Sequence, residues 1–511
     1  MPSALVGPTV GNVPTRHLSL ASITTDEIRA ALAALRAEIG LPAMFPPDVV
    51  EEARAAAQRD ITRDRQDRRD LDLVTIDPPG SMDLDQAVHV ASSGDGYLVR
   101  YAIADVAAFV TPGSALDREV HRRGMTVYGP ETRTPLHPKA LSEGAASLLP
   151  GEDRPAVLWS IGLDPDGEIT SVSVARALVR SRARLTYGEA QSVLDDGTAP
   201  ESLQLLADVG RLRQAAERAR GGVSLDVPEQ EIVRHDDGSF ALTFRRTLPI
   251  EGWNAQISLL TGIAAARLMR EAGVGIFRTL PPADPRDVAR LRRTAAALGI
   301  EWPDETTYAQ LLPHLESRKP AHAAFLSEAT TLFRGAGYFA FGVPGDDGAA
   351  LRLPPRTDAP GSGDAGHAAI AAEYAHVTAP LRRLVDRYGT EVCLAHAAGR
   401  DVPRWVAEAL PGLPATMAAT GRSTAGFERA CVDIVEAALL GPRVGQQFAA
   451  VVVDTEERKD GNPPTRGQVV LRNPAVRARV DGPALPLGER VRVTLTEASV
   501  EQRRVRFTLA D

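Results

Sequence analysis

The sequence predicts an α+β protein in three parts: a helical N-terminal module at residues 1–68, a large mixed domain at 69–442 and an OB-fold β-barrel at 443–511. Two observations support this prediction. Apolar runs of strand length and long segments of helical periodicity both occur between residues 73 and 442. From about residue 443, five short runs set Arg or Thr against Val, Leu or Phe, a pattern typical of an OB-type barrel. A chain of 511 residues is long enough for such an arrangement.

The composition is that of an ordinary globular protein, with 44% hydrophobic residues. The sequence contains only two cysteines, Cys393 and Cys431, which excludes a disulfide scaffold and fits a reducing compartment. Their spacing is not that of metal ligands. We find no signal-peptide pattern and no apolar run that approaches a membrane span, so we expect a cytoplasmic protein without membrane contact. With a net charge of −8, an anionic ligand would need a local basic channel.

The N-terminal module is predicted to form two short helices after a disordered stretch at residues 1–20. Thr24 and Glu27 form a capping-box pattern at the start of the first helix. The second helix is expected at residues 46–57, opened by two prolines. The pair could be a helix-turn-helix unit or a packing element, and we favour packing. The buried face of the first helix is predicted to consist of Ile28, Leu32, Leu35 and Ile39.

Three aspartates crowd one turn between two apolar strands. The run Leu73–Ile76 predicts a strand that delivers Asp77, and a Pro-Pro-Gly turn follows. Asp83 and Asp85 lie two residues apart, so they share a face if the chain is extended there. Carboxylates this close repel each other unless a cation lies among them, and oxygen ligands suit magnesium or manganese rather than zinc. The alternative is a solvated acidic turn, which the flanking apolar strands make less favourable.

The segment TIDPPGSMDLDQA resembles the catalytic signature of the ribonuclease II family, whose RNB domain carries four aspartates in this arrangement. Asp77, Asp83 and Asp85 match three of them, and Gln86 stands at the position of the fourth. The resemblance covers roughly residues 45–511. It identifies the mixed domain as an RNB catalytic domain and the terminal barrel as an RNA-binding OB domain.

Beyond the acidic turn, Arg180, Arg182 and Arg184 alternate along an expected strand. They could line a phosphate path, or they could be solvated. Further helices are expected at residues 202–220, at 250–269 and from Asp284 to Gly299, with an irregular stretch at 343–366.

The second motif, EYAHVTAPLRRLVDRYG, resembles the T-S-P-I-R-R-Y-x-D pattern of the family. Pro380 is expected in the first turn of a helix, with Arg382, Arg383 and Asp386 on its surface. Two arginines at a helix N-terminus favour phosphate binding, because unpaired N–H groups and the helix dipole add to their charge. The alternative is a pair of surface arginines that bind Asp386.

The resemblance implies a processive hydrolytic 3′→5′ exoribonuclease that degrades single-stranded RNA to nucleoside 5′-monophosphates. The implied cofactor is Mg²⁺, with Mn²⁺ as the alternative, and we expect a monomer. Because one carboxylate is missing, the alternative function is an RNA-binding protein on a catalytically weakened nuclease scaffold. An endonuclease would need an open groove instead of a narrow channel.

The residues implied for this function fall into three groups. Tyr128 and Tyr187 are expected to stack on RNA bases, although either could be a half-buried core residue. A metal site made of oxygens needs neither His367 nor His376, so we expect both to be structural. The expected catalytic residues are Asp77, Asp83, Asp85 and Arg382, the metal ligands are Asp77, Asp83, Asp85 and Gln86, and the substrate-binding residues are Tyr128, Tyr187, Arg383 and Glu251.

Overall fold

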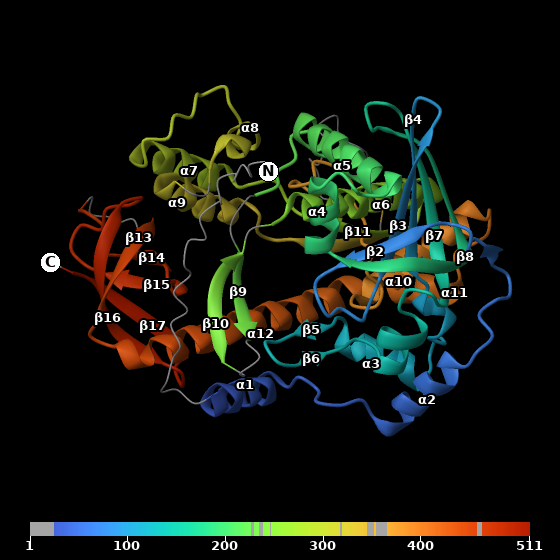
Figure 1. Ribbon diagram of the computed structural model, residues 1–511, viewed down its shortest axis with the longest axis horizontal. Helices are drawn as coiled ribbons and strands as arrows, with labels where there is room; N and C mark the ends of the chain where they lie inside the picture. The colour runs from blue at the N-terminus through green and yellow to red at the C-terminus, as the bar shows by residue number, and fades with distance from the viewer. Residues whose placement is uncertain are drawn as a thin grey trace, which may run out of the picture.

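A computed structural model describes residues 25–225, 229–234, 239–245, 247–316, 319–344, 352–353, 365–456 and 462–510. Residues 1–20, Thr24 of the expected capping box and most of the stretch at 343–366 lie outside this range. A curved sheet with its helices forms one end of the molecule and a small barrel forms the other, with a long helix running between them (Figure 1). The predicted α+β class is confirmed.

The acidic turn lies at the end of two neighbouring strands in a six-stranded sheet of order β1-β8-β2-β3-β4-β7. β8 also pairs with β7, so the sheet curves back on itself. β2 ends at Asp77 and β3 begins at Gln86, which confirms the strands expected on either side of the turn. The strands are β1 (Gln66–Asp67), β2 (Leu73–Asp77), β3 (Gln86–Ser93), β4 (Gly96–Ala104), β7 (Asp153–Leu163) and β8 (Ile169–Thr186).

Helices pack on this sheet and bury its apolar residues. The expected helices at 202–220 and 250–269 are confirmed as α5 (Glu201–Ala219), which packs on β3, and α6 (Pro249–Ala272), which packs on α5 and β4. Trp159 of β7 and Tyr101 of β4 are fully buried in the resulting core. The other helices of this part are α3 (Ala115–Arg123), α4 (Tyr187–Asp195), α10 (Leu384–Ala397) and α11 (Arg404–Ala409), with short turns η1 (Val106–Ala108), η2 (Leu141–Ala145) and η5 (Leu410–Gly412).

The two N-terminal helices do not form a helix-turn-helix unit. In α1 (Thr25–Ile39), Ile28, Leu32 and Leu35 of the predicted face are buried and Ile39 is half-buried. This face packs against α12 and the terminal barrel. In α2 (Pro47–Ala57), the buried face packs against α3, in the core of the central sheet. The helices belong to different cores, which supports the packing alternative.

Several small elements surround the central sheet. β5 (Val127–Tyr128) pairs with β6 (Arg133–Thr134), β9 (Glu229–Arg234) with β10 (Phe240–Arg245), and β11 (Gly275–Thr279) with β12 (Gly337–Phe341). A separate helical core holds α7 (Pro285–Ala297), α8 (Tyr308–Leu311), η3 (Leu312–His314), α9 (Pro320–Ala329) and η4 (Thr330–Leu332). The predicted start of α7 is confirmed, since the Asp284 side chain accepts a hydrogen bond from the Arg286 N–H.

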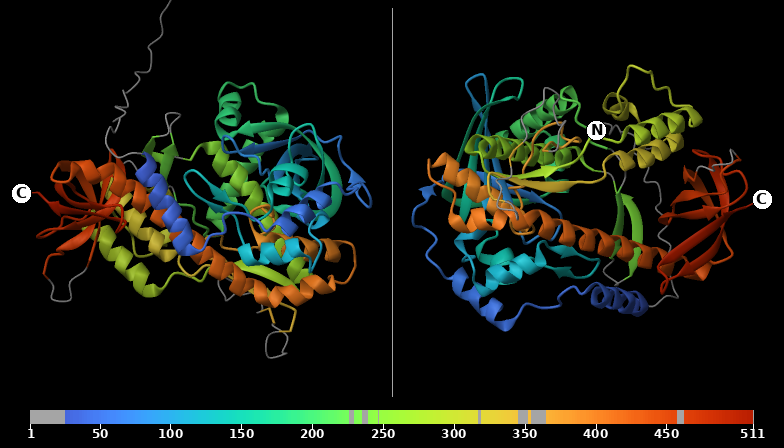
Figure 2. Two further views of the ribbon diagram at one scale, coloured as in Figure 1. Left: turned by 90° about the horizontal axis from the view of Figure 1, so that it is seen from below. Right: turned by 180° about the vertical axis from the view of Figure 1, so that it is seen from behind.

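The terminal strands form the expected closed barrel, in the order β13-β14-β15-β17-β16. α12 (Leu413–Leu440) runs from the sheet to the barrel, where its last turns share one core with α1, β10 and the barrel strands (Figure 2). Within this contact Glu436 is buried and accepts hydrogen bonds from Gln230 Nε2 at 2.7 Å and the Arg477 N–H at 3.0 Å. The strands are β13 (Gln447–Thr455), β14 (Arg466–Arg472), β15 (Ala475–Asp481), β16 (Arg490–Ser499) and β17 (Arg504–Leu509), preceded by η6 (Gly441–Arg443).

No helix in the described part of the chain combines the length and apolar character that crossing a membrane would require.

Candidate active site

The segment between β2 and β3 is held rigidly by a serine from another part of the chain. Ser147 Oγ accepts a hydrogen bond from the Leu84 N–H at 3.0 Å and donates to the Met82 carbonyl at 2.6 Å. Leu84 is fully buried between Asp83 and Asp85 and anchors the segment in the core. Because neighbouring side chains on an extended chain point in opposite directions, burial of Leu84 turns both aspartates towards the opposite side.

The expected aspartates border a cleft of about 1100 Å³. It brings together the β2–β3 segment, the β5–β6 hairpin, the start of α4 and the turn before α10, which are distant in sequence. The cleft is lined by Asp77, Asp83, Asp85, Gln86, Tyr128, Tyr187 and Arg382 of the expected set, and by Pro78, Pro79, Gly80, Ser81, Gly129, Pro130, Glu131, Thr132, Arg133 and Lys139.

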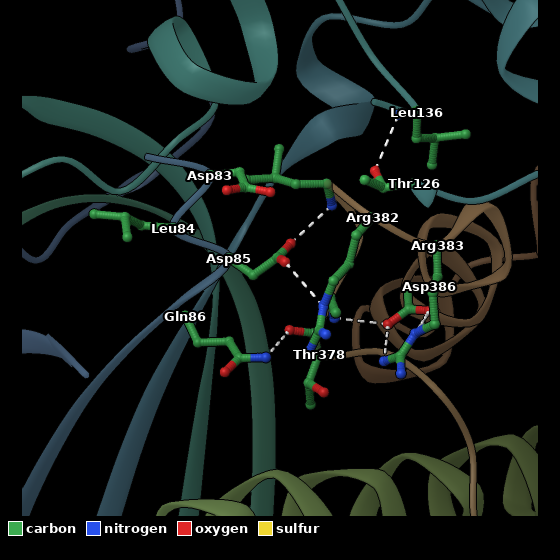
Figure 3. A network of polar contacts seen from close by, with 12 residues as sticks. Asp83, Leu84, Asp85, Gln86, Thr126, Leu136, Thr378, Arg382, Arg383 and Asp386 are labelled. Carbon is green, nitrogen blue, oxygen red and sulfur yellow. Dashed lines mark hydrogen bonds and ion pairs between the residues drawn. The ribbon is translucent and has the colours of Figure 1, made fainter. Parts of the chain in front are cut away.

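Asp85 is buried and Asp77 is half-buried, and in both the cost of burial outweighs the favourable charge of nearby Arg382. Burial raises the pKa of Asp85 to about 8 and the pKa of Asp77 to about 6. Asp85 accepts a hydrogen bond from the Leu381 N–H at 2.7 Å, and its other oxygen lies 3.6 Å from Arg382 Nε (Figure 3). Asp77 Oδ2 is buried and has no hydrogen-bond partner. A buried carboxylate oxygen without a partner is the kind of group that a cation would stabilise.

Asp83 has different partners, which come from the β5–β6 hairpin. Arg133 Nη1 lies 2.6 Å from Asp83 Oδ1, and the Tyr128 hydroxyl donates to Oδ2 at 3.2 Å. Among the described residues, no three His, Cys, Asp or Glu side chains are grouped so that they could hold a metal ion as they stand. The ion pair with Arg133 directs Asp83 to the hairpin.

The donor set nevertheless fits a hard divalent cation. Three carboxylates face one cleft, two of them destabilised by burial and one with an unpartnered oxygen. Magnesium and manganese prefer such oxygen ligands.

The two expected arginines have separate roles. Arg382 faces the cleft beside Asp85, and 47% of its side chain is exposed. Arg383 instead forms two hydrogen bonds with Asp386, both at 2.8 Å, and it does not line the cleft. The alternative of pairing with Asp386 therefore describes Arg383, whereas Arg382 remains available to a ligand.

The expected start of this helix is wrong. α10 begins at Leu384, and Pro380 lies in a preceding turn in which the Arg382 and Arg383 N–H groups both donate to the Ala379 carbonyl. Asp386 is fully buried and not at the surface, because it accepts both the Arg383 bonds and one from the Ala379 N–H at 2.7 Å. The turn thus depends on a buried carboxylate that hydrophobic periodicity does not distinguish from a surface residue.

Gln86 uses both ends of its amide within the protein. Its Nε2 donates to the Thr378 carbonyl at 2.5 Å, and its Oε1 accepts from the Tyr101 hydroxyl at 2.9 Å. Tyr101 is itself hydrogen-bonded to Ser258 at 2.8 Å. Figure 3 shows the Gln86 amide directed at Thr378, while Asp85 faces Arg382. The amide connects the strand of the aspartates to the turn that carries Arg382.

Of the expected substrate-binding residues, Tyr128 and Tyr187 line the cleft and Glu251 does not. Tyr128 is 41% exposed at the tip of β5, and Tyr187 begins α4, fixed by a capping box of Thr186 and Glu189. Both line the cleft. Glu251 caps α6 by accepting from the Leu248 N–H at 2.9 Å, and it binds Arg245. These structural contacts keep Glu251 out of the cleft lining.

The basic strand is largely neutralised by carboxylates. Arg180 forms an ion pair with Asp153, and Arg182 forms one with Asp72. Their charges are therefore already paired within the protein, which argues against the expected phosphate path. Arg184 contacts the β2–β3 segment, donating to the Ser81 carbonyl at 3.0 Å. His376 is buried and bonded to the Tyr338 hydroxyl at 2.8 Å, in line with a structural role.

Arg133 and Lys139 also line the cleft, although no motif in the sequence marks them as site residues. The local signal there was the turn composition of Gly129-Pro130, which predicts a reversal but not its position. That Arg133 reaches Asp83, fifty residues away in sequence, follows from tertiary packing alone.

Family models match most of the chain. The model of the RNB domain matches residues 65–392, and the model of the RNase II-type exonuclease C-terminal S1 domain matches residues 446–510. The first match includes every cleft residue, and the second covers all five strands of the barrel.

Known proteins with similar sequences or folds agree with these matches. Ribonuclease R of Chlamydia trachomatis is 28% identical over 366 residues, covering 69% of this chain and 50% of that protein. The chain therefore spans about half the length of such curated relatives. Mycoplasma genitalium RNase R in complex with ribose-methylated single-stranded RNA has the same fold, with a TM-score of 0.81, 21% identity and coverage of 95% of this chain and 78% of that one. Yeast Ssd1, described as a pseudonuclease, shares it at a TM-score of 0.67 and 16% identity, over 89% and 55% of the two chains.

Proposed function

Because the chain belongs to the RNB-domain family, we propose that it is a hydrolytic 3′→5′ exoribonuclease that degrades single-stranded RNA processively to nucleoside 5′-monophosphates. The observation that supports this proposal is the cleft itself. Three aspartates, one exposed arginine and two tyrosines from four separate segments face one space of about 1100 Å³.

We assign the metal ligands to Asp77, Asp83 and Asp85, with Mg²⁺ as the ion and Mn²⁺ as the alternative. When bound, divalent ions of this kind activate water and neutralise the scissile phosphate. Gln86 is left out of this set, because both ends of its amide are engaged by Tyr101 and Thr378.

The side chains of the cleft supply binding and charge stabilisation. Arg382 faces the cleft and would hold the phosphate as negative charge develops on it. Asp85 fixes the turn that presents Arg382, through its bond to the Leu381 N–H. Tyr128 and Tyr187 would stack on successive bases, which tolerates any sequence, as a general degrading enzyme requires. Arg383 acts on this site through Asp386, as a positioning residue.

The terminal barrel is proposed to bind the RNA backbone upstream of the cleft. Arg479 of β15, together with Arg490 and Arg492 of β16, is exposed on its surface. Alternating cations on a small barrel suit the phosphates of a single strand. We further propose that the protein acts as a monomer in the cytoplasm, where Cys393 and Cys431 stay unpaired.

The second candidate function is an RNA-binding protein on a weakened nuclease scaffold. The missing fourth carboxylate favours it, and the fold alone cannot decide, since a pseudonuclease shares it. Retention of three aspartates and Arg382 around one cleft favours the enzyme.

The decisive experiment is a product assay with 5′-end-labelled single-stranded RNA and Mg²⁺. We expect the labelled strand to be converted to a short 5′ end product without intermediate lengths, as a processive enzyme requires, and a uniformly labelled RNA run in parallel to release nucleoside 5′-monophosphates. Internal fragments would indicate an endonuclease, and binding without cleavage would indicate the weakened scaffold. Asp85→Asn serves as the matched control, because it removes one carboxylate charge with little change in size.

A further inference from the structure

The hairpin that brings Tyr128 into the cleft is too short to fix its own position. β5 and β6 contain two residues each, paired as Val127 with Thr134 and Tyr128 with Arg133. Hairpins of this kind are marginally stable in water at best. The base is anchored to the Arg382 turn, since the Thr126 N–H donates to the Arg382 carbonyl at 3.0 Å. Its tip must be held by whatever packs on the other side.

The N-terminal helix α1 makes polar contacts with this tip. Arg36 donates to Thr132 Oγ1 at 3.0 Å and to Thr134 Oγ1 at 2.7 Å. Arg29 Nε donates to Glu131 at 2.9 Å. Thr134 and Thr132 flank Arg133, the residue that binds Asp83.

Apolar contacts place the hairpin between α1 and α12. Leu32 and Leu35 of α1 belong to the same buried core as Val127 of β5 and Phe427 of α12. A methyl group added at Gly129 would lie 3.2 Å from the Phe427 ring, so the backbone of the tip packs closely on α12. Figure 2 shows α1 lying along α12.

The same helix is bound to the barrel. Glu38, in the last turn of α1, forms an ion pair with Arg503 in the turn between β16 and β17. α1 therefore contacts both the wall of the cleft and the domain proposed to bind RNA. It precedes the part of the chain that the RNB model matches.

From these contacts we infer that α1 is a positioning element of the RNA channel and that Arg36 is its main positioning residue. Arg36 holds the β5–β6 hairpin so that Tyr128 and Arg133 face the cleft, and Glu38 fixes the barrel relative to that hairpin. The inference rests on the proposed function for its substrate, RNA, but not for the structural coupling. The simpler view is that α1 only covers the core at the end of α12.

The test compares Arg36→Met, which keeps the aliphatic stem but removes both hydrogen bonds, with Arg36→Lys, which keeps the charge. Arg404→Met on α11 is the control, because Arg404 is 90% exposed. Hydrogen–deuterium exchange should rise in Arg36→Met at the Gly129 amide, which donates to the Thr132 carbonyl at 2.9 Å. Affinity for a single-stranded oligoribonucleotide in EDTA should fall about five-fold, since the variant lacks two hydrogen bonds that orient Tyr128. Arg36→Lys should be intermediate and Arg404→Met unchanged.

A double-mutant cycle separates positioning from general stability. If Arg36 acts through Tyr128, Arg36→Met should have little further effect on RNA affinity in a Tyr128→Ala background. Unchanged exchange at Gly129, or a fully additive loss of affinity, would overturn the inference. Both readouts are independent of hydrolysis, so a protein that releases no mononucleotides would refute the proposed function and leave this result interpretable.

Discussion

Replacement of Gln86 separates a metal ligand from a residue that positions the arginine turn. In Gln86→Ala the Thr378 carbonyl loses its 2.5 Å hydrogen bond, and Thr378 is only 3% exposed, so water cannot easily replace the donor. An unsatisfied buried carbonyl costs about 1–3 kcal/mol. Tyr101 keeps its bond to Ser258, so its loss is smaller. If the turn shifts to relieve this cost and Arg382 loses about 1.4 kcal/mol of its stabilisation of the transition state, kcat/KM falls about ten-fold.

The metal affinity should behave differently. Since the Gln86 amide is directed at Tyr101 and Thr378, the dissociation constant for Mn²⁺, measured by isothermal titration calorimetry without RNA, should stay within about two-fold of wild type in Gln86→Ala. Asp83→Asn removes a charged ligand and should weaken Mn²⁺ binding about ten-fold or more.

The result that would refute this reasoning is a loss of Mn²⁺ affinity in Gln86→Ala comparable to that in Asp83→Asn. Tighter binding in Gln86→Asp would add to that conclusion, because a restored fourth carboxylate would then face the ion. Superimposable binding curves for wild type and Gln86→Ala, together with reduced kcat/KM, would assign Gln86 to the positioning of Arg382.

The cleft and the barrel support four further predictions. Asp85→Asn should abolish mononucleotide release from uniformly labelled RNA while RNA affinity stays nearly unchanged, since an asparagine oxygen can still accept the Leu381 N–H bond that holds the Arg382 turn. Arg133→Met should tighten Mn²⁺ binding a few-fold, about the effect of removing a cation 2.6 Å from Asp83. Substitution of Arg479 and Arg492 by Ala should weaken RNA binding and reduce its salt slope by about two, since each arginine is expected to neutralise one phosphate. Burial raises the pKa of Glu436 to about 7, so the free-energy cost of burying its carboxylate grows as the pH rises from 4.5 to 7. Glu436→Gln should therefore stabilise the protein by up to about 3 kcal/mol at pH 8 and give no gain at pH 4, as thermal denaturation would show.

The structure changes how the barrel should be tested. The barrel shares a buried core with α12 and α1 that includes Val435 and Leu440. Deletion of residues 443–511 would expose this core, so a loss of RNA binding could not be separated from a loss of protein stability. Surface substitutions such as Arg479→Ala keep the core intact.

Sequence patterns within a segment predicted the helices and strands that carry their own periodicity, caps or turn residues. The strands on either side of the acidic turn, α5, α6, α7 and the five barrel strands all carry their signal in periodicity, caps and turn residues. That Asp77, Asp83 and Asp85 border one cleft was predictable for the same reason, because one short segment contains all three. Arg382 also lies in the cleft, as the second motif implied.

Interactions between distant segments could not be predicted in this way. Asp386 is buried by its bonds to Arg383 and the Ala379 N–H, and no neighbouring residue in the sequence marks it as a core carboxylate. Arg133 was missed because its pairing with Asp83 depends on where the β5–β6 hairpin folds. Glu251 was placed by resemblance, although its capping of α6 satisfies the carboxylate within its own helix.

Gln86, which stands where the resemblance implies a fourth aspartate, and the buried Asp386 both hold the segment that leads to Arg382. A carboxylate at position 86 would face the Thr378 carbonyl, an acceptor that cannot donate to it, whereas the amide of Gln86 donates there and accepts from Tyr101. Asp386 holds the same turn from the other side, through the Ala379 N–H. The turn that presents Arg382 is thus fixed between a neutral amide and a buried carboxylate. Compared with the aspartate that the resemblance implies at this position, Gln86 therefore lacks one negative charge and gains a hydrogen bond to the segment that leads to Arg382.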